Sequence, residues 1–415
     1  MSEIIIIGGG AAGMMAAVFA AKKGNHVQVF EKNEKLGKKL YITGKGRCNL
    51  TNACETEELF NAVCRNPKFL YSAFYSFNSQ DVMDFFEKEA GIPLKTERGN
   101  RVFPRSDHSS DIIRGLQNLM KKYGVTVHLN TEVESLIASE ERVRGIRIKE
   151  GKKEILCDQI IVATGGLSYP STGSTGDGYR FAKSCGMKVS PCSPSLVPLV
   201  TKEDYIPQMQ GLSLKNVSLT IFRGNKKVYQ DFGEMMFTHY GVTGPMILSA
   251  SAYIGDQTEK GELKAELDLK PALSPEQLDQ RLLREFEGNK NKQLKNVIGV
   301  LFPASLTPVF LELCGSSPDK KIHDISREER SRFIHLMKHF PFTITGRGEF
   351  KEAIITRGGV SVKEVNPHTM ESRKVQGLYF IGEVLDLDAV TGGFNLQIAW
   401  STAYLAAQAA GNERE

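Results

Sequence analysis

The sequence predicts an α/β fold in which the two ends of the chain form one domain and the middle is an insert. An apolar strand at Glu3–Ile7 leads into the glycine turn GGGAAG, a helix at Met14–Lys23 and a second strand at Val27–Glu31, which is a βαβ start. The last part of the chain returns to this pattern with GLYFIGE, a glycine turn and a long helix from about Asn395. Between these ends, the chain after Pro191 has proline-punctuated, strand-like pieces followed by helical patterns.

These patterns set the expected domain boundaries. A discontinuous Rossmann-like domain covers residues 1–190 and 345–415, and a β-barrel-like insert covers 191–270 and 341–344, interrupted by a helical subdomain at 271–340. The first domain is expected to include a helix at Asp111–Tyr123 and strands around Val125–Leu129, Glu132–Ile137, Val143–Ile148 and Gln159–Thr164. The insert is expected to include a strand at Leu263–Leu269 and helices at Ser274–Phe286, Lys292–Leu301 and Ser326–Phe340.

The composition is that of a globular protein without membrane spans. The 415 residues are 41% hydrophobic and 24% charged, and no apolar run approaches the roughly 18 residues of a span. The first strand leaves no room for a signal peptide. The seven cysteines are odd in number and form no CxxC pair, which argues against a disulfide framework and a metal site and favours the cytoplasm. The net charge of +5 permits a nucleic-acid partner but indicates no stable complex with one.

The first glycine turn is a GxGxxG between a strand and a helix. Gly8 allows the tight turn, Gly10 lets a pyrophosphate approach the backbone, and Gly13 lets helix and strand pack closely. The helix N-terminus directs N–H groups at the phosphates, and Glu31 ends the second strand, where an acid binds ribose hydroxyls. This motif predicts a dinucleotide without separating NAD from FAD. The contacts expected from it are Gly8, Gly10, Ala11, Ala12, Gly13, Glu31 and Lys32.

Two further glycine turns follow strands. Thr164-Gly165 follows a buried strand, although a plain strand-ending turn explains it equally well. Glu383 suits a ribose or ribityl hydroxyl, and the helix opened by TGGFN suits the flavin N1/O2 edge; a well-capped helix is the structural alternative. Because the three turns occur in the order of an FAD domain, together they predict FAD rather than NAD. The contacts expected from the second and third turns are Thr164, Gly165, Gly382, Glu383, Gly392, Gly393, Phe394, Asn395 and Leu396.

The segment TGKGRCNLTN at 43–52 is expected to wrap the cofactor. The further contacts expected here and on a later strand are Lys38, Gly46, Arg47, Asn49 and Val133. Cys48 either packs against the flavin, which we favour, or donates a proton to substrate. A catalytic dithiol with Cys54 is the weakest reading, because five residues separate the two thiols rather than the four of CxxxxC.

Two other residues are catalytic candidates. Arg101 lies in a cationic loop, ERGNRVFPR, that is expected to border the same cleft. His239, in FTHYGVTGP, is a candidate proton donor, although a lone histidine is more often structural. The cations expected to line one surface toward the flavin are Lys38, Lys39, Lys45, Arg98, Arg101 and Arg105. They form either a solvated surface or one that attracts an anionic substrate such as RNA.

The motifs together resemble the BaiN/RdsA-like (YhiN-like) family of FAD-dependent oxidoreductases nearly end to end. The resemblance rests on IIIIGGGAAGMMAA, TGKGRCNLTN, ATGGLSYPSTGSTGDGY, MMFTHYGVTGP, TRGGVSVKEVNPHTMES and GLYFIGEVLDLDAVTGGFNLQIAWSTA. It implies an FAD domain of the glutathione-reductase-like kind with an inserted β-barrel that carries a helical subdomain. It also implies reduction of carbon–carbon double bonds, in bile-acid intermediates or in a uridine of large-subunit ribosomal RNA.

The function predicted from the sequence is FAD-dependent reduction of an activated C=C bond by hydride transfer from flavin N5. The expected substrate is a uridine in ribosomal RNA or a small enone-like molecule. No second GxGxxG is present, so NAD(P)H is expected only as a transient electron donor. The alternatives are a flavin-containing RNA-binding or assembly factor without turnover, and a thiol-disulfide reductase that uses Cys48.

Overall fold

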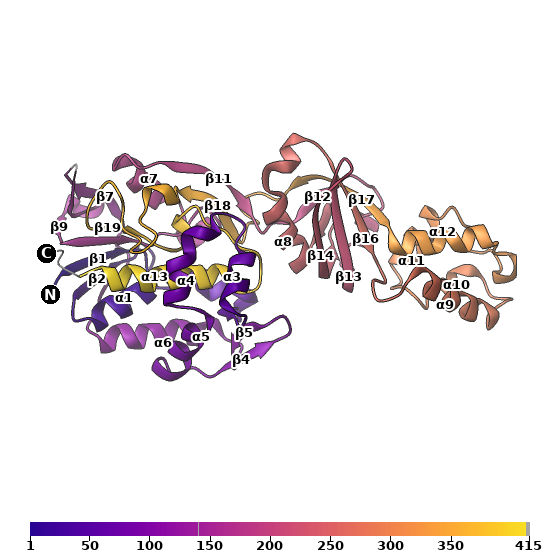
Figure 1. The fold of residues 1–415 in the computed structure, drawn as a ribbon, viewed down its shortest axis with the longest axis horizontal. Coiled ribbons are helices and arrows are strands. Elements are labelled where there is room, and N and C mark those ends of the chain that lie inside the picture. The colour runs from indigo at the N-terminus through magenta and orange to yellow at the C-terminus, as the bar shows by residue number, and fades with distance from the viewer. Residues whose placement is uncertain (140, 412–415) are drawn as a thin grey trace. The chain divides into compact units, whose positions relative to one another are not determined.

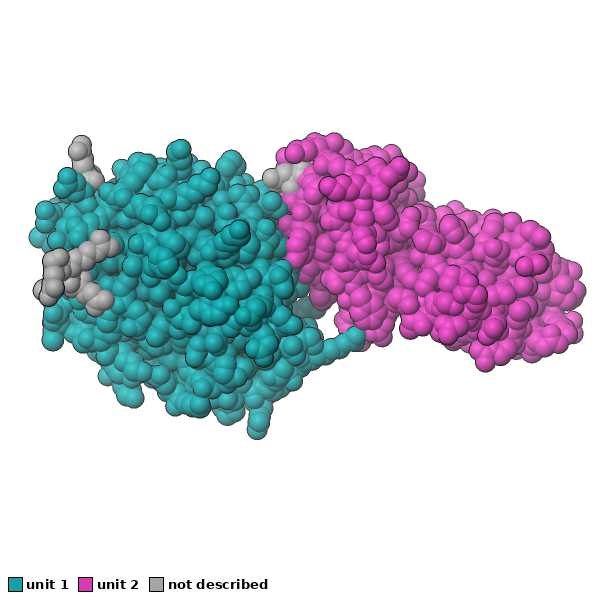
Figure 2. Space-filling model, in the orientation of Figure 1, with its two compact units in different colours: residues 1–195, 350–415 teal, residues 196–349 magenta. Residues whose placement is uncertain are grey.

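The computed structural model describes residues 1–139 and 141–411, which fall into two compact units. Unit 1 consists of Met1–Ser195 and Phe350–Glu415, and unit 2 of Leu196–Glu349 (Figure 2). Each has a hydrophobic core of its own. Both changes of unit lie five residues beyond the boundaries expected from the sequence (195 against 190, 349 against 344). At the first boundary the reason is that β11 (Val189–Ser195) pairs with β18 (Ile355–Val360) inside unit 1.

A parallel five-stranded sheet forms the centre of unit 1, in the order β19-β10-β1-β2-β6. Its strands are β1 (Glu3–Ile7), β2 (His26–Phe30), β6 (Thr126–His128), β10 (Gln159–Val162) and β19 (Leu378–Phe380). Strand β1 lies between its successor β2 and the much later β10. Such a reversal of strand order is the place where α/β sheets bind ligands, at the carboxyl ends of the strands.

Two helices rich in alanine lie side by side in unit 1, α1 (Ala11–Lys22) and α13 (Phe394–Ala409) (Figure 1). Their small side chains allow close packing, and both helices are almost entirely buried. Both run from the carboxyl edge of the sheet, because α1 follows β1 and α13 follows the turn after β19. Their N-termini therefore lie near the glycine turns.

The other elements of unit 1 surround this centre. The segment at 56–89, where no element was predicted from the sequence, is largely helical. The helices and helical turns are α2 (Lys38–Ile42), η1 (Thr43–Gly46), α3 (Thr56–Ala62), η2 (Pro67–Leu70), α4 (Tyr71–Ser76), α5 (Ser79–Asp84), the π-helical η3 (Phe85–Glu89), α6 (Ser109–Lys122), η4 (Glu150–Lys152), η5 (Pro170–Thr172), α7 (Asp177–Ser184), η9 (Val362–Glu364) and η10 (Gly382–Val384). Two antiparallel sheets complete the unit, β3-β5-β4 (Thr51–Asn52, Arg101–Pro104, Leu94–Glu97) and β7-β8-β9 (Val133–Ala138, Val143–Ile148, Glu154–Leu156).

Unit 2 contains a closed six-stranded barrel in the order β12-β15-β14-β13-β16-β17, which confirms the predicted fold class. Its strands are β12 (Leu199–Thr201), β13 (Ser213–Arg223), β14 (Lys226–Phe237), β15 (Gly241–Thr243), β16 (Leu263–Asp268) and β17 (Phe340–Arg347). The helical elements are η6 (Pro207–Met209), α8 (Pro245–Ile254), η7 (Gly255–Lys260), α9 (Pro275–Glu287), α10 (Leu294–Ile298), α11 (Leu306–Leu313), η8 (Ile322–Asp324) and α12 (Arg327–Lys338). Those from α9 to α12 interrupt the barrel between β16 and β17. Among the described residues, every helix is too short or too polar to cross a membrane.

Candidate functional site

The first glycine turn has two glycines that the backbone requires and one that faces open space. A Cβ atom on Gly8 would lie 2.5 Å from the carbonyl oxygen of Ala163, and one on Gly13 would overlap the carbonyl oxygen of Gly8. A Cβ atom on Gly10, by contrast, would have no atom within 4 Å among the described residues. Packing thus explains Gly8 and Gly13, whereas the absence of a side chain at Gly10 keeps a space clear at the start of α1.

The N-terminus of α1 faces this space without a cap from the protein. Its N-cap residue is Gly10, no side chain bonds the cap, and no acidic residue lies in the first turn. The first N–H groups of a helix need partners and carry a partial positive charge. An anionic phosphate at Gly10 supplies both the acceptors and the charge, so the turn fits a pyrophosphate.

Glu31, at the end of β2, is buried beside the turn. Its Oε2 accepts a 2.8 Å hydrogen bond from Gly9 N, and its Oε1 accepts bonds of 2.8 and 2.6 Å from N and Nδ2 of Asn33. A carboxylate has about four acceptor positions, so one on Oε2 remains for a ribose hydroxyl. The two lysines expected here have protein partners: Lys32 pairs with Asp177 at 2.7 Å, and Lys38 lies 3.3 Å from Glu34.

The three glycine turns predicted from the sequence meet at the carboxyl edge of the sheet. The second turn packs on the first, because Ala163 and Thr164 contact the position of Gly8. The third turn packs on α1, since a Cβ atom on Gly382 would lie 2.9 Å from that of Ala12. Thr164 also accepts a 3.1 Å bond from the backbone of Gly178, which joins the second turn to α7.

The segment TGKGRCNLTN wraps the third turn. A Cβ atom on Gly393 would overlap the carbonyl group of Thr51, so that position requires glycine. Asn52 Nδ2 donates a 3.1 Å bond to the carbonyl oxygen of Gly392. Asn49, with its amide oxygen turned toward Gly393, accepts a 3.0 Å bond from the Gly393 N–H. The loop therefore fixes the N-terminus of α13, which has no side-chain cap and no acid in its first turn.

Glu383, in the third turn, accepts hydrogen bonds from three protein groups. Lys39 Nζ lies 2.6 Å from its Oε2, and Ser168 Oγ and Thr356 N donate bonds of 2.8 and 2.9 Å to its Oε1. The predicted role toward a ribityl hydroxyl therefore competes with three protein donors. The sequence indicated neither Ser168 nor Thr356, which come from other segments of the chain.

The remaining expected contacts of the third turn have several environments. Asn395 binds the backbone N and O of Ala389 at 3.0 and 2.8 Å, so its side chain shapes the loop before α13. Phe394 and Leu396 are half-buried on the first turn of α13, and Val133 is buried at the start of β7.

Arg47 is occupied by acidic partners rather than free for phosphates. Its guanidinium pairs with Glu97, bonds Asp107 through Nε at 2.8 Å, and lies 4.2 Å above the ring of Phe103. Hydrogen bonds with the two acids raise the pKa of Arg47, and the bond with Arg47 lowers the pKa of Glu97. The pKa of Asp107 is lowered first by its hydrogen bond with Lys95 and then by that with Arg47. Arg47 thus joins the segment at 43–52 to the hairpin of β4 and β5. Gly46 beside it has open space at its Cβ position.

Cys48 is fully buried with a left-handed backbone (φ +58°). Burial raises the pKa of its thiol to about 12, and a hydrogen bond with Thr43 only partly offsets this. Burial also raises the pKa of Cys54 to about 11. Since the thiolate is the reactive species in disulfide exchange, neither environment favours that chemistry.

The other two catalytic candidates lie in different units. Arg101 begins β5, and its Nε donates a 3.0 Å bond to the carbonyl oxygen of Arg98. Asn52 joins this hairpin to the third turn by donating to the carbonyl oxygens of Gly99 and Gly392. Arg101 therefore lies beside the glycine turns of unit 1. His239 is an exposed residue of unit 2, with its ring 4.7 Å from that of Tyr240.

Known proteins similar to this chain identify its family. Residues 2–409 match the family described as HI0933-like protein Rossmann domain. The chain belongs to the HI0933-like family. Two similar relatives are a 3-dehydro-bile acid delta(4,6)-reductase of Clostridium scindens, 33% identical over 99% of both chains, and a ribosomal RNA dihydrouridine synthase of Haemophilus influenzae, 34% identical over 98% of both.

Among solved structures, a 3-ketosteroid delta1-dehydrogenase of Sterolibacterium denitrificans shares the fold, with a TM-score of 0.54 and 14% identity over 98% of both chains. Family membership confirms the enzyme class predicted from the sequence: this HI0933-like protein is an FAD-dependent oxidoreductase.

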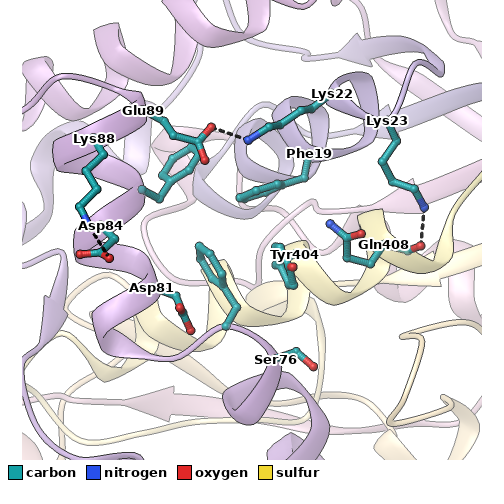
Figure 3. A pocket seen from close by; sticks show the side chains of 12 residues that line it. Phe19, Lys22, Lys23, Ser76, Asp81, Asp84, Lys88, Glu89, Tyr404 and Gln408 are labelled. Atoms are coloured by element: carbon teal, nitrogen blue, oxygen red, sulfur yellow. Dashed lines mark hydrogen bonds and ion pairs between the residues drawn. The ribbon is translucent and has the colours of Figure 1, made fainter.

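A pocket of about 620 Å³ in this HI0933-like protein lies elsewhere in unit 1 (Figure 3). It is at the C-terminal ends of α1 and α13, and its aromatic lining residues are Phe19, Phe77, Phe85 and Tyr404. At its rim Lys22 pairs with Glu89 at 2.7 Å and Lys88 with Asp84 at 2.8 Å. Helix C-termini carry partial negative charge, and these cations are already paired. The pocket therefore does not suit the phosphates of a dinucleotide.

Proposed function

We propose that this protein holds FAD at the three glycine turns of unit 1 and reduces a carbon–carbon double bond conjugated to a carbonyl group. Both relatives support this reaction type, because a delta(4,6)-reductase and a dihydrouridine synthase each add two hydrogens across a ring double bond. The structural observation that carries the cofactor assignment is the open space at Gly10, before the uncapped N-terminus of α1.

The residues at the turns have distinct proposed roles toward the cofactor. The N-terminus of α1 binds the pyrophosphate, and the free acceptor of Glu31 binds the adenosine ribose. The uncapped N-terminus of α13 directs its N–H groups at the pyrimidine edge of the flavin, where negative charge gathers on reduction. FAD, when bound here, supplies the hydride. The buried Cys48 packs in this loop, so we do not favour a thiol-disulfide reductase.

Ribosomal RNA is the substrate that the surface of unit 1 favours. Lys45 and Arg105 are exposed on the two loops that Arg47 joins, and Tyr41, four residues before Lys45, is 53% exposed. Exposed cations meet phosphates, and exposed aromatic rings stack on bases. Of the six cations expected on this surface, Lys39 instead turns inward to Glu383.

Mass spectrometry of ribosomal RNA from cells with and without the gene tests this function. We expect one uridine to lose the mass of two hydrogens when the gene is absent, and to regain it when the gene is restored. A gene that encodes the Gly10→Val variant is the control, because that variant should not hold FAD. Unchanged RNA would point instead to a small enone.

The electron donor and the location in the cell are separate proposals. We propose that NAD(P)H visits the flavin as a transient donor, since the sequence has no second dinucleotide turn. Rapid mixing of the oxidised protein with NADH and NADPH under anaerobic conditions tests this by bleaching of the flavin absorbance. A cytoplasmic location stays a prediction.

A further inference from the structure

Two buried carboxylates lie in the loop between Glu383 and Gly392, outside the proposed cofactor contacts. Asp386 is 4% exposed and Asp388 is fully buried. Each has one carboxylate oxygen, Oδ1, without a hydrogen-bond partner among the described residues. A buried polar atom left without a partner costs free energy, so a pair of them beside a cofactor site indicates a function.

The two acids differ in how they are held. Asp386 Oδ2 accepts bonds of 2.8 Å from Arg65 Nη2 and 2.7 Å from Ser190 Oγ, which stabilise the ionised form. Asp388 Oδ2 accepts one longer bond of 3.3 Å, from Ser195 Oγ. Asp386 is therefore held as the partner of an arginine, whereas the carboxyl of Asp388 receives a single, longer hydrogen bond from a hydroxyl group.

The charges around Asp388 come from three neighbouring segments. Arg357 on β18 and Arg65 favour its ionised form, and Asp386 disfavours it. Burial outweighs the two arginines and raises the pKa of Asp388 to about 6. The group therefore changes its protonation state close to neutral pH.

The loop holds Asp388 at a fixed position relative to α13. Cys64 N donates a 2.8 Å bond to the carbonyl oxygen of Asp388, and Val390 N donates a 2.9 Å bond to that of Ala62. Asn395, in the first turn of α13, binds Ala389 on both sides of its peptide. The acid thus lies six residues or fewer from the helix end that we assign to the flavin, in a braced loop.

We propose that Asp388 carries the proton that double-bond reduction consumes and releases it through the hydroxyl of Ser195. This rests on the proposed function. One carbon of the double bond would gain the hydride that FAD supplies when bound, and the other gains the hydroxyl proton of Ser195. Ser195 accepts the proton of Asp388 as it gives up its own, and the resulting Asp388 carboxylate regains a proton from solvent. Asp388 is thus a proton-holding residue that acts through Ser195.

The other predicted proton donors are weaker in this role. The buried thiol of Cys48 has a pKa of about 12 and is a poor acid. His239, the other predicted proton donor, is an exposed residue of unit 2. A group that titrates near the working pH is the efficient proton donor.

The test compares Asp388→Asn and Ser195→Ala with the matched control Asp386→Asn. Each protein is reduced with dithionite without oxygen and mixed with ribosomal RNA from a strain that lacks the gene, or with cyclohexenone, across a pH range around 6. Oxidation of the flavin is followed by absorbance. A parallel series uses ferricyanide, which takes electrons and needs no proton from this loop. Infrared spectra of the resting proteins detect the protonated carboxyl directly.

We expect Asp388→Asn to slow oxidation by RNA or cyclohexenone on the order of 100-fold and to lose the pH inflection near 6. Ser195→Ala should slow it similarly. Oxidation by ferricyanide should match the wild type in all variants. Asp386→Asn should keep the pH inflection but move it to lower pH, because the charge of Asp386 raises the pKa of Asp388. The infrared band should titrate near pH 6 in the wild type and be missing in Asp388→Asn.

Two results overturn different statements. If the wild type reacts and Asp388→Asn shows the same rate and pH profile, or if no carboxyl band titrates, the role of Asp388 is wrong and the proposed function stands. If the wild type reacts with neither the RNA nor cyclohexenone, the proposed function is wrong, and the role of Asp388 is wrong with it. If Asp388→Asn does not fold, Ser195→Ala and the wild-type infrared titration decide.

Discussion

Two helices at the glycine turns of unit 1, α1 and α13, and two helices in the helical part of unit 2, α9 and α12, begin in opposite ways. α9 and α12 begin at Ser274 and Ser326, whose side chains cap the helix while Gln277 and Glu329 bond back. α1 and α13 begin at glycines without any side-chain cap. α5 of unit 1, away from the turns, has a full capping box. A missing side-chain cap is not particular to the glycine turns, since α6 and α8 lack one too; what distinguishes the start of α1 is the open space at Gly10.

The largest effect should come from filling the open space before α1. We expect Gly10→Val to fold and to purify without colour, because its side chain meets no protein atom but takes the room of the pyrophosphate. Flavin absorbance per protein and thermal unfolding of the apoprotein measure the two halves of this prediction. Gly13→Val is the contrast: its side chain overlaps the backbone of Gly8, so it should fail to fold. Full flavin occupancy in Gly10→Val would break the comparison.

A smaller effect concerns the buried Asp388 of unit 1 and the pH dependence of the unfolding free energy. The pKa of Asp388 is about 6 when folded, above the ordinary 3.8, so folding favours the protonated form. That contribution is complete below the unfolded pKa and is lost as pH rises through about 6. Relative to Asp388→Asn, the wild type should lose on the order of 1–3 kcal/mol of unfolding free energy between about pH 4 and pH 8. Urea denaturation at several pH values measures this, and parallel curves would contradict it.

Removing the N-cap of α12 or α9 in unit 2 tests whether side-chain caps affect stability without affecting FAD content. Ser326→Ala should lower the free energy of unfolding by about 1 kcal/mol, because α12 loses an acceptor for the N–H of Glu329. Its FAD content should stay at the wild-type level, and Ser274→Ala on α9 should behave alike. Chemical denaturation and flavin absorbance give both readings. Loss of flavin in either variant would mean that these N-caps also affect FAD binding.

The exposed cations should have the smallest effect. Replacing Lys45 and Arg105 with Gln should weaken RNA binding and reduce its salt dependence by about one logarithmic unit of slope per cation. FAD content should not change. The control replaces Lys226 and Lys264, which are exposed on the barrel. Equal losses in both pairs would show that charge alone, and not this surface, attracts the RNA.

Local patterns predicted most of the sheet and the glycine turns. β1 and β8 have the bounds expected from the sequence, and α9 and α12 begin beside Ser274 and Ser326, where the expected helices begin. These features depend on neighbours within a few residues, so their signals are local. The helices between residues 56 and 89 were not predicted, because they are short and interrupted.

Partners distant in the sequence account for what could not be predicted. Arg47 was expected to contact the cofactor, and the acidic partners that the sequence did not indicate lie 50 and 60 residues further along the chain. Lys39 and Glu383 are 344 residues apart. Asp386 and Asp388 did carry a signal that sequence reasoning passed over, since LDLDAV places two acids among apolar residues.

The order of the elements along the chain determines when the proposed cofactor site can form during synthesis. Unit 2 is one uninterrupted stretch, whereas unit 1 needs β19 and α13, which follow it. Trp400 on α13 donates a 2.9 Å bond to the carbonyl oxygen of Leu50, and Gly393 packs on Thr51, so the cofactor loop is covered only by these late elements. During synthesis, domains fold as their residues emerge from the ribosome. Unit 2 is therefore complete first, and the proposed flavin site is completed only when β19 and α13 have been synthesised.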